Sequence, residues 1–156
     1  MFFCCVLGLQ TLAGAQNETA ALKKLTRGSD VIVTGKVTGR KSGWNEDKTR
    51  IYTRTTLQVN EVLKGKGTGG SVEIITPGGE VDGVGELYTH MPVFENNEEV
   101  LVFLKKDAKN RAYRVLDGED GKLIIRNDPN TNEKISAKDP GISEIKALIR
   151  KLVNVK

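Results

Sequence analysis

The chain has 156 residues, of which 38% are apolar and 28% are charged, and its formal net charge is +4. This length fits one domain, and this composition excludes a disordered or collagen-like chain. The 2 cysteines and 1 histidine exclude a Cys/His zinc module and a framework of several disulfides. The 17 glycines and the low aromatic content of 5% indicate many tight turns, which favours short strands over long helices.

Residues 1–15, MFFCCVLGLQTLAGA, carry no charged side chain and end in the A-x-A pattern Ala13-Gly14-Ala15. An apolar run followed by small residues predicts a secretory signal peptide, although no Lys or Arg precedes the run. The run is too short to span a bilayer, which takes about 20 apolar residues. We therefore expect a secreted or periplasmic protein in which residues 16–156 form a single domain without cysteine. A buried N-terminal strand is the alternative.

Charge is arranged in blocks along the chain. Residues 1–60 sum to +5, residues 61–120 to −5 and residues 121–156 to +4. No run of Lys and Arg exceeds two residues, so the pattern favours a mixed, solvated surface over a nucleic-acid interface. A local basic patch around Arg40, Lys41 and Arg54 is the alternative.

The N-terminal half predicts one helix and two strands. Residues 20–27 predict a short helix ended by Gly28, and residues 30–37 predict a first strand with a bend or bulge at Gly35. Residues 41–50 predict a polar loop. The longest strand signal covers residues 51–62, where one face carries Ile51, Thr53, Thr55, Leu57 and Val59. Such alternation is typical of a strand that is wet on one side.

The second half predicts further short strands and a closing helix. Residues 98–105 carry apolar side chains at both odd and even positions, which predicts a central strand buried on both faces. Asp139 is placed to cap a helix over 140–153, with Pro140 at its first position. The other predicted strands are 71–76, 112–116 and 122–126. Residues 80–88 predict an irregular strand or a bulged loop. Residues 127–138 predict a polar loop. The apolar stripe of the helix consists of Ile142, Ile145, Leu148, Ile149 and Leu152.

These elements predict a mainly β fold. Several short strands at regular spacing, with no helix between them, favour a small antiparallel OB-like barrel with a short N-terminal helix and a C-terminal amphipathic helix. A sandwich of the same strands is the alternative.

The residues offer little to an enzyme. No H-E-x-x-H, G-x-S-x-G or P-loop motif occurs, and the predicted mature chain has no thiol. The sole histidine, His90, supplies the histidine that a Ser-His-Asp site needs, but no sequence motif marks a serine for such a site. Asp117, Glu119 and Asp120 cluster in a glycine-rich turn, where turn chemistry explains them as well as calcium does. We therefore expect no enzyme, no catalytic or metal-binding residues and no cofactor.

Binding is better supported by the residue types. Trp44, in the predicted loop at 41–50, is either an interface anchor or a lid on the core. Tyr52 lies on the solvent parity of its strand, and His90 and Phe94 could line one end of the barrel. Trp44, Tyr52, His90 and Phe94 are therefore the expected partner contacts.

Several segments carry a family resemblance, namely SDVIVTGKV (29–37), VNEVLKG (59–65), PGG (77–79) and EEVLVFL (98–104). Together they resemble a family of uncharacterised exported bacterial domains, found alone or beside matrixin-type metallopeptidases. The resemblance covers roughly residues 20–126, and the closing helix is similar too. This chain has no peptidase motif, so the neighbour's activity is not implied.

The same layout is distantly similar to the netrin-like, OB-type barrel of the tissue inhibitors of metalloproteinases. The shared sequence pattern is VTGKV (33–37) followed by VLKG (62–65). Those inhibitors chelate zinc through an N-terminal cysteine, which the predicted mature chain lacks. The similarity therefore implies a barrel shape without the inhibitory wedge.

From these observations we expect an exported, non-enzymatic binding module for a protein or a cell-surface polymer. A regulator or inhibitor of an extracellular peptidase is the alternative. We expect a monomer without a membrane span and without a nucleic-acid partner, although OB-type binding of single strands and a hydrolase using His90 remain open alternatives.

Overall fold

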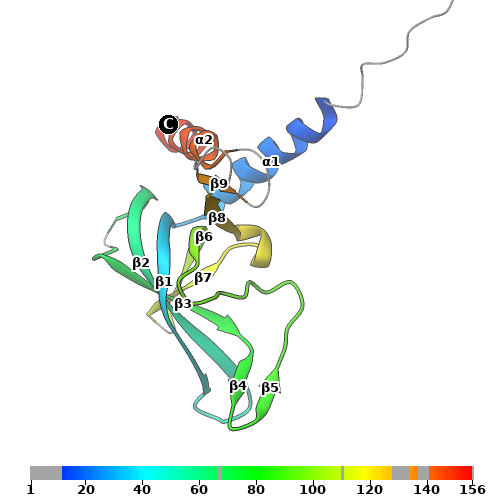
Figure 1. Cartoon of the computed structure of the whole chain (residues 1–156), viewed down its shortest axis with the longest axis vertical. Helices are drawn as coiled ribbons and strands as arrows, with labels where there is room; N and C mark the ends of the chain where they lie inside the picture. The colour runs from blue at the N-terminus through cyan, green and yellow to red at the C-terminus, as the bar shows by residue number, and fades with distance from the viewer. Residues whose placement is uncertain (1–11, 67, 110, 128–133, 137–140, 156) are drawn as a thin grey trace, which may run out of the picture.

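The computed structural model describes residues 12–66, 68–109, 111–127, 134–136 and 141–155 (Figure 1). Most of the predicted signal peptide therefore lies outside the described residues. The fold is mainly β, with one helix near each end of the described chain. In chain order the elements are α1 (Leu12–Gly28), β1 (Val31–Trp44), β2 (Ile51–Lys64), β3 (Ser71–Pro77), β4 (Gly79–Val81), β5 (Val84–Glu86), β6 (Glu99–Asp107), β7 (Ala112–Val115), the 3-10 helix η1 (Gly118–Gly121), β8 (Lys122–Asn127), β9 (Lys134–Ser136) and α2 (Ile142–Asn154).

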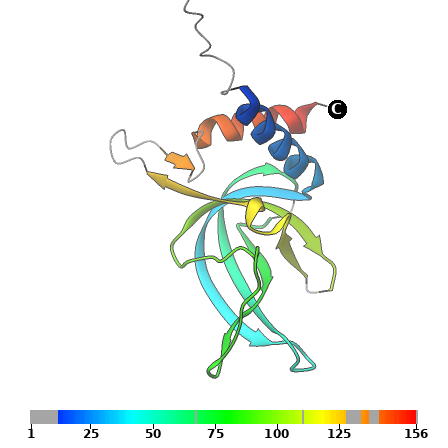
Figure 2. The same ribbon diagram turned by 90° about the vertical axis from the view of Figure 1, so that its right-hand side faces the viewer.

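The main sheet is mixed and partly closed. Its strand order is β1-β2-β3-β7-β6-β8-β9, and β1 also pairs with β6, so that β1, β2, β3, β7 and β6 are linked in a ring (Figure 2). Within the described residues, β3 and β7 run parallel and are joined through the pair Ile74 and Tyr113, whereas the other pairings are antiparallel. The expectation of a purely antiparallel sheet is therefore corrected at this seam. The strands β4 and β5 form a separate hairpin.

Strand β1 closes the ring because it pairs with β2 along one edge and with β6 along the other. It pairs with β6 from Val31 to Lys36 and with β2 from Ile32 to Trp44. The register with β2 shifts beside Gly35, as the sequence predicted for this residue. A Cβ atom on Gly35 would lie 2.3 Å from the carbonyl oxygen of Gln58, so only glycine allows this approach.

Strand β6 separates two apolar clusters. Its residues from Val100 to Leu104 are all buried, which confirms the prediction of a strand covered on both faces. Because neighbouring side chains of a strand point to opposite faces, Val100, Val102 and Leu104 join one cluster and Leu101 and Phe103 join the other. The first cluster fills the ring with Val33, Val37, Leu57, Val72, Ile74 and Phe94. The second lies under the helices with Leu25, Ile32, Leu63, Ile125, Ile142, Ile145 and Ile149.

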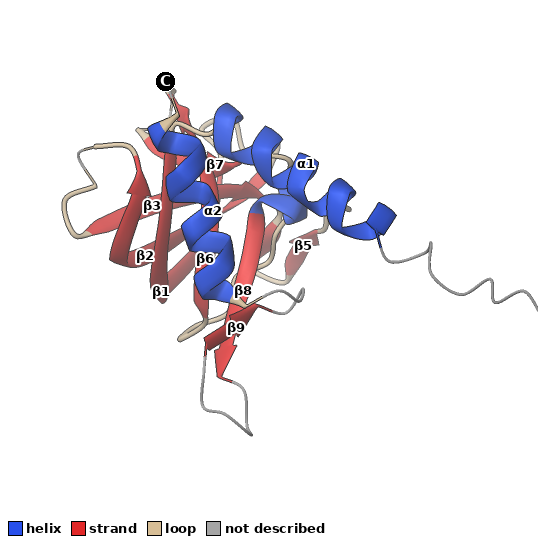
Figure 3. Ribbon diagram, turned by 90° about the horizontal axis from the view of Figure 1, so that it is seen from above, coloured by secondary structure: helices blue, strands red, loops and turns tan. Residues whose placement is uncertain are grey.

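Both helices cover the same end of the main sheet (Figure 3). Helix α2 is tied to β2 because Glu61 accepts from Lys146 at 2.7 Å and also pairs with Arg150. The hydrogen bond from Lys146, and then the Arg150 guanidinium, hold the pKa of the Glu61 carboxyl below its ordinary value. The ion pairs fix the position of α2 over the second apolar cluster.

Several predicted boundaries are wrong. Helix α1 begins at Leu12, eight residues before the predicted start, and contains the predicted cleavage pattern at 13–15. Helix α2 begins at Ile142 with Gly141 at its N-cap, which corrects the predicted start and cap; Asp139 and Pro140 lie outside the described residues. Strand β9 replaces part of the predicted loop at 127–138. The start of α1 was missed because residues 12–15 were assigned to the signal peptide, and β9 was missed because hydrophobic periodicity carries no information in a polar segment.

Strand β1 also continues for seven residues beyond its predicted end. The polar and glycine-containing stretch 38–44 pairs with β2 up to Trp44 and Ile51, so Trp44 ends a strand and does not lie in a loop. Pairing along a long hairpin needs backbone hydrogen bonds and no buried side chains, which explains why the apolar pattern missed it.

Candidate binding site

A pocket of about 580 Å³ opens at the end of the sheet away from the helices. Its walls come from β1, β2 and β3, from the β4–β5 hairpin and from the segment between Leu87 and Phe94. Figures 1 and 2 show this hairpin and the far ends of β1 and β2 on the side opposite α1 and α2. The volume lies within the range of small-molecule sites, about 300–1,000 Å³.

Strand register lines the pocket floor with hydroxyl groups. Ser42 of β1 lies opposite Thr53 of β2, which in turn lies opposite Thr76 of β3. Paired residues of an antiparallel ladder point to the same face, so the three side chains form one row. Ser42 Oγ and Thr53 Oγ1 are 2.9 Å apart, and Thr53 Oγ1 donates to the carbonyl oxygen of Gly78 at 2.8 Å. These hydroxyls are held in place by one another and by the backbone.

The next row of the ladder places Arg40, Thr55 and Ile74 side by side. Thr55 is fully buried and lines the pocket, yet its hydroxyl has no hydrogen-bond partner among the described residues. A buried hydroxyl without a partner costs about 1–3 kcal/mol. Such a group in a pocket wall is uncommon and calls for a physical explanation.

The turn after β3 closes tightly over the hydroxyl row. Gly78 and Gly79 have positive φ values of +94° and +133°. A Cβ atom on Gly79 would lie 2.4 Å from both Ser42 Oγ and Thr53 Oγ1. Glycine is therefore required here by the backbone conformation and by space, and the predicted break at residues 77–79 is part of the pocket wall.

Polar groups fix the β5 side of the pocket. The Glu86 carboxylate accepts from the Ile51 backbone N–H and from the Tyr88 hydroxyl, both at 3.1 Å. The Arg50 guanidinium donates to the same Tyr88 oxygen at 2.6 Å, and this hydrogen bond raises the pKa of the guanidinium. The chain from Arg50 through Tyr88 to Glu86 links the β1–β2 turn to the hairpin.

The opposite wall rests on a buried ion pair. The Lys122 ammonium lies 2.6 Å from a Glu98 carboxylate oxygen and 4.7 Å from the centre of the Phe94 ring. It also donates to the carbonyl oxygen of Val93. The side chains of Lys122 and Glu98 are only 7% and 12% exposed, so the pair is shielded from water. It holds the segment that carries Val93 and Phe94 against the ring.

The structure does not gather the four predicted partner contacts. Phe94 is 2% exposed and belongs to the core as well as to the pocket wall. His90 lies outside the pocket lining, and its exposed ring is 3.4 Å from Glu119. Trp44 and Tyr52 lie on adjacent pairs of the β1–β2 ladder, Trp44 opposite Ile51 and Tyr52 opposite Gly43, so their side chains point to opposite faces.

Sequence reasoning missed the hydroxyl row itself. The alternation over 51–57 put Thr53 and Thr55 on the same face as Ile51 and Leu57, and all four are buried. The threonines on the buried face of this strand were the sequence feature that could have indicated the row. Their partners Ser42 and Thr76 could be found only from the register, which no local pattern supplies.

The pocket offers hydrogen bonding and apolar contact. Hydroxyls line its floor together with the carboxylates of Glu80 and Glu86, and the described lining contains no histidine, lysine or cysteine. Among the residues that the structure describes, no group of three His, Cys, Asp or Glu side chains is arranged to hold a metal ion. Of the carboxylates at 117–120, Asp117 pairs with Lys24 and Glu119 with His90.

Neither described helix combines the length and the apolar character that crossing a membrane requires. No protein-family model matches the sequence, and a search of curated proteins finds no match.

Proposed function

We propose that the protein is an exported, non-enzymatic binding module that holds a polyhydroxylated segment of a cell-surface polymer in the hydroxyl-lined pocket. The observation that carries the proposal is the buried Thr55 hydroxyl, which lines the pocket without a hydrogen-bond partner among the described residues. A ligand hydroxyl can both donate to and accept from such a group.

The rest of the lining favours a saccharide over a charged ligand. The Arg40 guanidinium pairs with the Glu95 carboxylate, 3.4 Å away, and the lining also carries the carboxylates of Glu80 and Glu86, which disfavour an anionic ligand. Apolar side chains from Leu87, Met91 and Val93 complete the wall. A sugar ring presents hydroxyls at its edge and C–H groups on its faces, so it matches a pocket that is polar on its floor and apolar on its rim.

The fold supports the same proposal by analogy. We infer that the ring of β1, β2, β3, β7 and β6 is an OB-like barrel, because the additional pairing of β1 with β6 joins these strands in a ring. Barrels of this type use the face of their second and third strands to bind oligonucleotides and oligosaccharides. The pocket floor lies on β1, β2 and β3.

Export rests on the apolar segment at 1–15 and on the resemblance to exported bacterial domains. All residues that line the pocket lie after Ala15 in the chain, so cleavage there leaves the pocket complete. A binding role outside the cell therefore agrees with the position of the pocket in the chain.

Titration with neutral trisaccharides tests the proposal. Chitotriose, cellotriose and maltotriose are added to the protein, and binding is followed by calorimetry and by the NMR signals of the threonine methyl groups. We expect at least one probe to shift Thr53 and Thr55, and Thr55→Val to weaken its binding about fivefold. Thr34→Val is the matched control, because Thr34 is buried in β1 outside the pocket.

Two results would overturn the proposal: no probe shifts the pocket threonines, or Thr55→Val binds as tightly as the unchanged protein. Inhibition of a secreted metallopeptidase by the chain, unaffected by Thr55→Val, would instead support the alternative of a peptidase regulator.

A further inference from the structure

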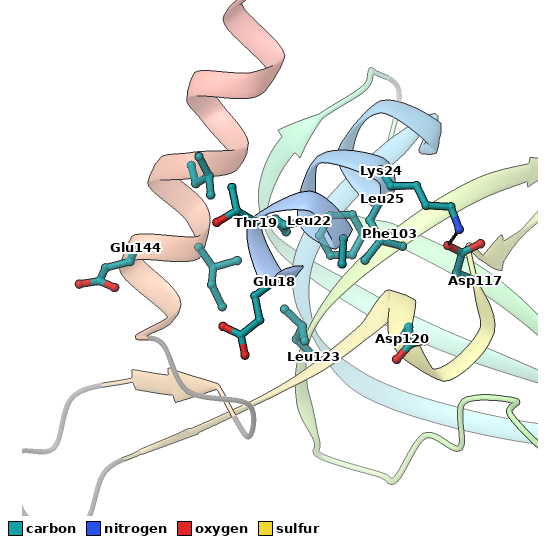
Figure 4. A pocket seen from close by; sticks show the side chains of 13 residues that line it. Glu18, Thr19, Leu22, Lys24, Leu25, Phe103, Asp117, Asp120, Leu123 and Glu144 are labelled. Atoms are coloured by element: carbon teal, nitrogen blue, oxygen red, sulfur yellow. Dashed lines mark ion pairs between the residues drawn. The ribbon is translucent and has the colours of Figure 1, made fainter. Parts of the chain in front are cut away.

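A second cavity, of about 640 Å³, lies at the helix-covered end of the sheet. We call it the helix groove. Its walls are α1 and α2, and β6, η1 and β8 close it from the sheet side (Figure 4). The apolar lining consists of Ala21, Leu22, Leu25, Phe103, Leu123, Ile145 and Leu148.

Part of this apolar surface is not used by the fold. Leu22 and Leu123 are half-buried at the edge of the second apolar cluster, and Ala21 is exposed. Leu148 lines the groove but belongs to neither cluster, although it lies in the apolar stripe of α2. An apolar groove that internal packing leaves half open is typical of a binding surface.

The border of the groove is acidic. Among the described residues, the carboxylates of Glu18, Asp117, Asp120 and Glu144 and the ammonium of Lys24 line it. Lys24 lies 2.7 Å from Asp117, and this hydrogen bond raises the pKa of the lysine, so its charge is already matched. In Figure 4 the Glu18 side chain descends from α1 towards β8, Asp120 lies on η1, and Glu144 extends outward from the start of α2, away from the other side chains drawn.

This acidic border contrasts with the chain as a whole, whose formal net charge is +4. An apolar floor with carboxylates along its border complements a ligand that is apolar on one side and cationic on the other. An amphipathic helix with Lys or Arg on its polar face has this character, and α1 and α2 supply two helical walls against which a third can pack.

We propose that the helix groove binds a cationic amphipathic helix from a partner protein, with apolar residues at i, i+3, i+4 and i+7 on the floor and basic residues facing Glu18 and Glu144. The helix groove is separate from the hydroxyl-lined pocket, so this inference stands without the proposed saccharide ligand.

A second copy of the chain fits the groove less well. The commonest dimers are two-fold symmetric and bring identical surfaces together. Groove-to-groove pairing would place the carboxylates of one copy against those of the other, and like charges at an interface are unfavourable.

The test uses three synthetic peptides of equal length. The first has Leu at i, i+3, i+4 and i+7 and Lys on its polar face, the second has the same composition in scrambled order, and the third has Glu in place of Lys. Binding to the full chain is measured by fluorescence anisotropy at low and high salt. We expect the first peptide to bind, the other two to bind at least tenfold more weakly, and salt to weaken binding.

Two variants of the groove test its acidic border and its apolar floor separately. Glu18→Lys with Glu144→Gln removes acidic charge at exposed positions and is expected to weaken the first peptide about tenfold. Leu148→Gln, which removes apolar lining outside the core clusters, is expected to weaken it similarly. The matched control is Glu46→Lys with Asp47→Asn, which makes the same charge change in the exposed β1–β2 turn at the other end of the sheet.

The proposal is overturned if the scrambled peptide binds equally well, if the groove variants bind as the control does, or if the chain dimerises through the groove in a light-scattering measurement that Leu148→Gln abolishes. Thermal melts of every variant exclude unfolding as the cause of lost binding. Saccharide binding by the Glu18→Lys/Glu144→Gln variant should be unchanged, so failure of this proposal and failure of the proposed function are distinguishable.

Discussion

Ser42 Oγ and Thr53 Oγ1 lie 2.9 Å apart across two strands, and both occupy the space that a side chain on Gly79 would need. Their contact depends on a residue without a side chain, because a Cβ atom at Gly79 would lie 2.4 Å from each hydroxyl. The hydroxyl row of the pocket is therefore set by a glycine in a neighbouring turn.

Gly79→Ala is expected to destabilise the protein by about 3 kcal/mol, because the new methyl group overpacks the site and the φ of +133° is strained for alanine. The free energy of unfolding in urea measures this. Gly85→Ala is the control in the same hairpin, since its nearest neighbour would be 4.0 Å away; we expect it to change stability by less than about 0.5 kcal/mol. Equal effects of the two substitutions would contradict the packing of the turn.

Thr55→Val is expected to stabilise the protein by about 1 kcal/mol, since it replaces a buried hydroxyl that has no partner among the described residues. Thr53→Val should have the opposite effect and cost about 1–2 kcal/mol, because it removes the hydrogen bonds to Ser42 and Gly78. Thermal and urea unfolding compare the two variants. A loss of stability in Thr55→Val would show that its hydroxyl is satisfied.

Lys122→Met is expected to destabilise the protein by about 3–5 kcal/mol, because it leaves the shielded Glu98 carboxylate without its counter-charge. Adding Glu98→Gln should recover part of this loss, and a double-mutant cycle in urea measures the coupling. The exposed pair of Lys134 and Glu99 is the comparison, where Lys134→Met should cost less than about 1 kcal/mol. Additive effects of the Lys122 and Glu98 substitutions would rule out the ion pair.

Stability should fall in acid partly through Glu61. Its pKa is lowered in the folded state by Lys146 and Arg150, so its contribution is fully present above its ordinary value of 4.5 and is lost as pH falls through the lower folded value. Urea unfolding between pH 7 and pH 3 measures this. Glu61→Gln should cost about 1 kcal/mol at pH 7 and flatten the acid slope. Asp30, whose pKa is also lowered, first by the Lys106 backbone N–H, keeps part of the slope; an unchanged slope in Glu61→Gln would contradict the assignment.

The sequence predicted those parts of the fold in which packing dictates residue type. The buried run from Val100 to Leu104 and the alternation from Ile51 to Leu57 were both found, because a buried face demands apolar side chains at a fixed period. The bulge at Gly35 was found because glycine within a strand marks a close backbone approach.

The candidate site was not predictable in the same way. The Ser42, Thr53 and Thr76 row needs the register of three strands, and residues 42, 53 and 76 have no common local pattern. Lys122 was read as the first residue of a strand, whereas its burial depends on Glu98 and Phe94 from a distant segment. Trp44 attracted attention as a large side chain in a polar stretch, but a long hairpin carries it away from the pocket.

The seam between β3 and β7 has a consequence for the behaviour of the molecule in crowded surroundings. Along the described strands this seam is joined at the pair Ile74 and Tyr113, whereas β2 and β3 pair at seven positions and β6 and β7 at four. Thermal opening will begin there, and each opening bares two rows of unpaired amides. A foreign extended chain can add to those rows, so the weakest join of the ring is also a place where strand exchange and fibrous assembly can start.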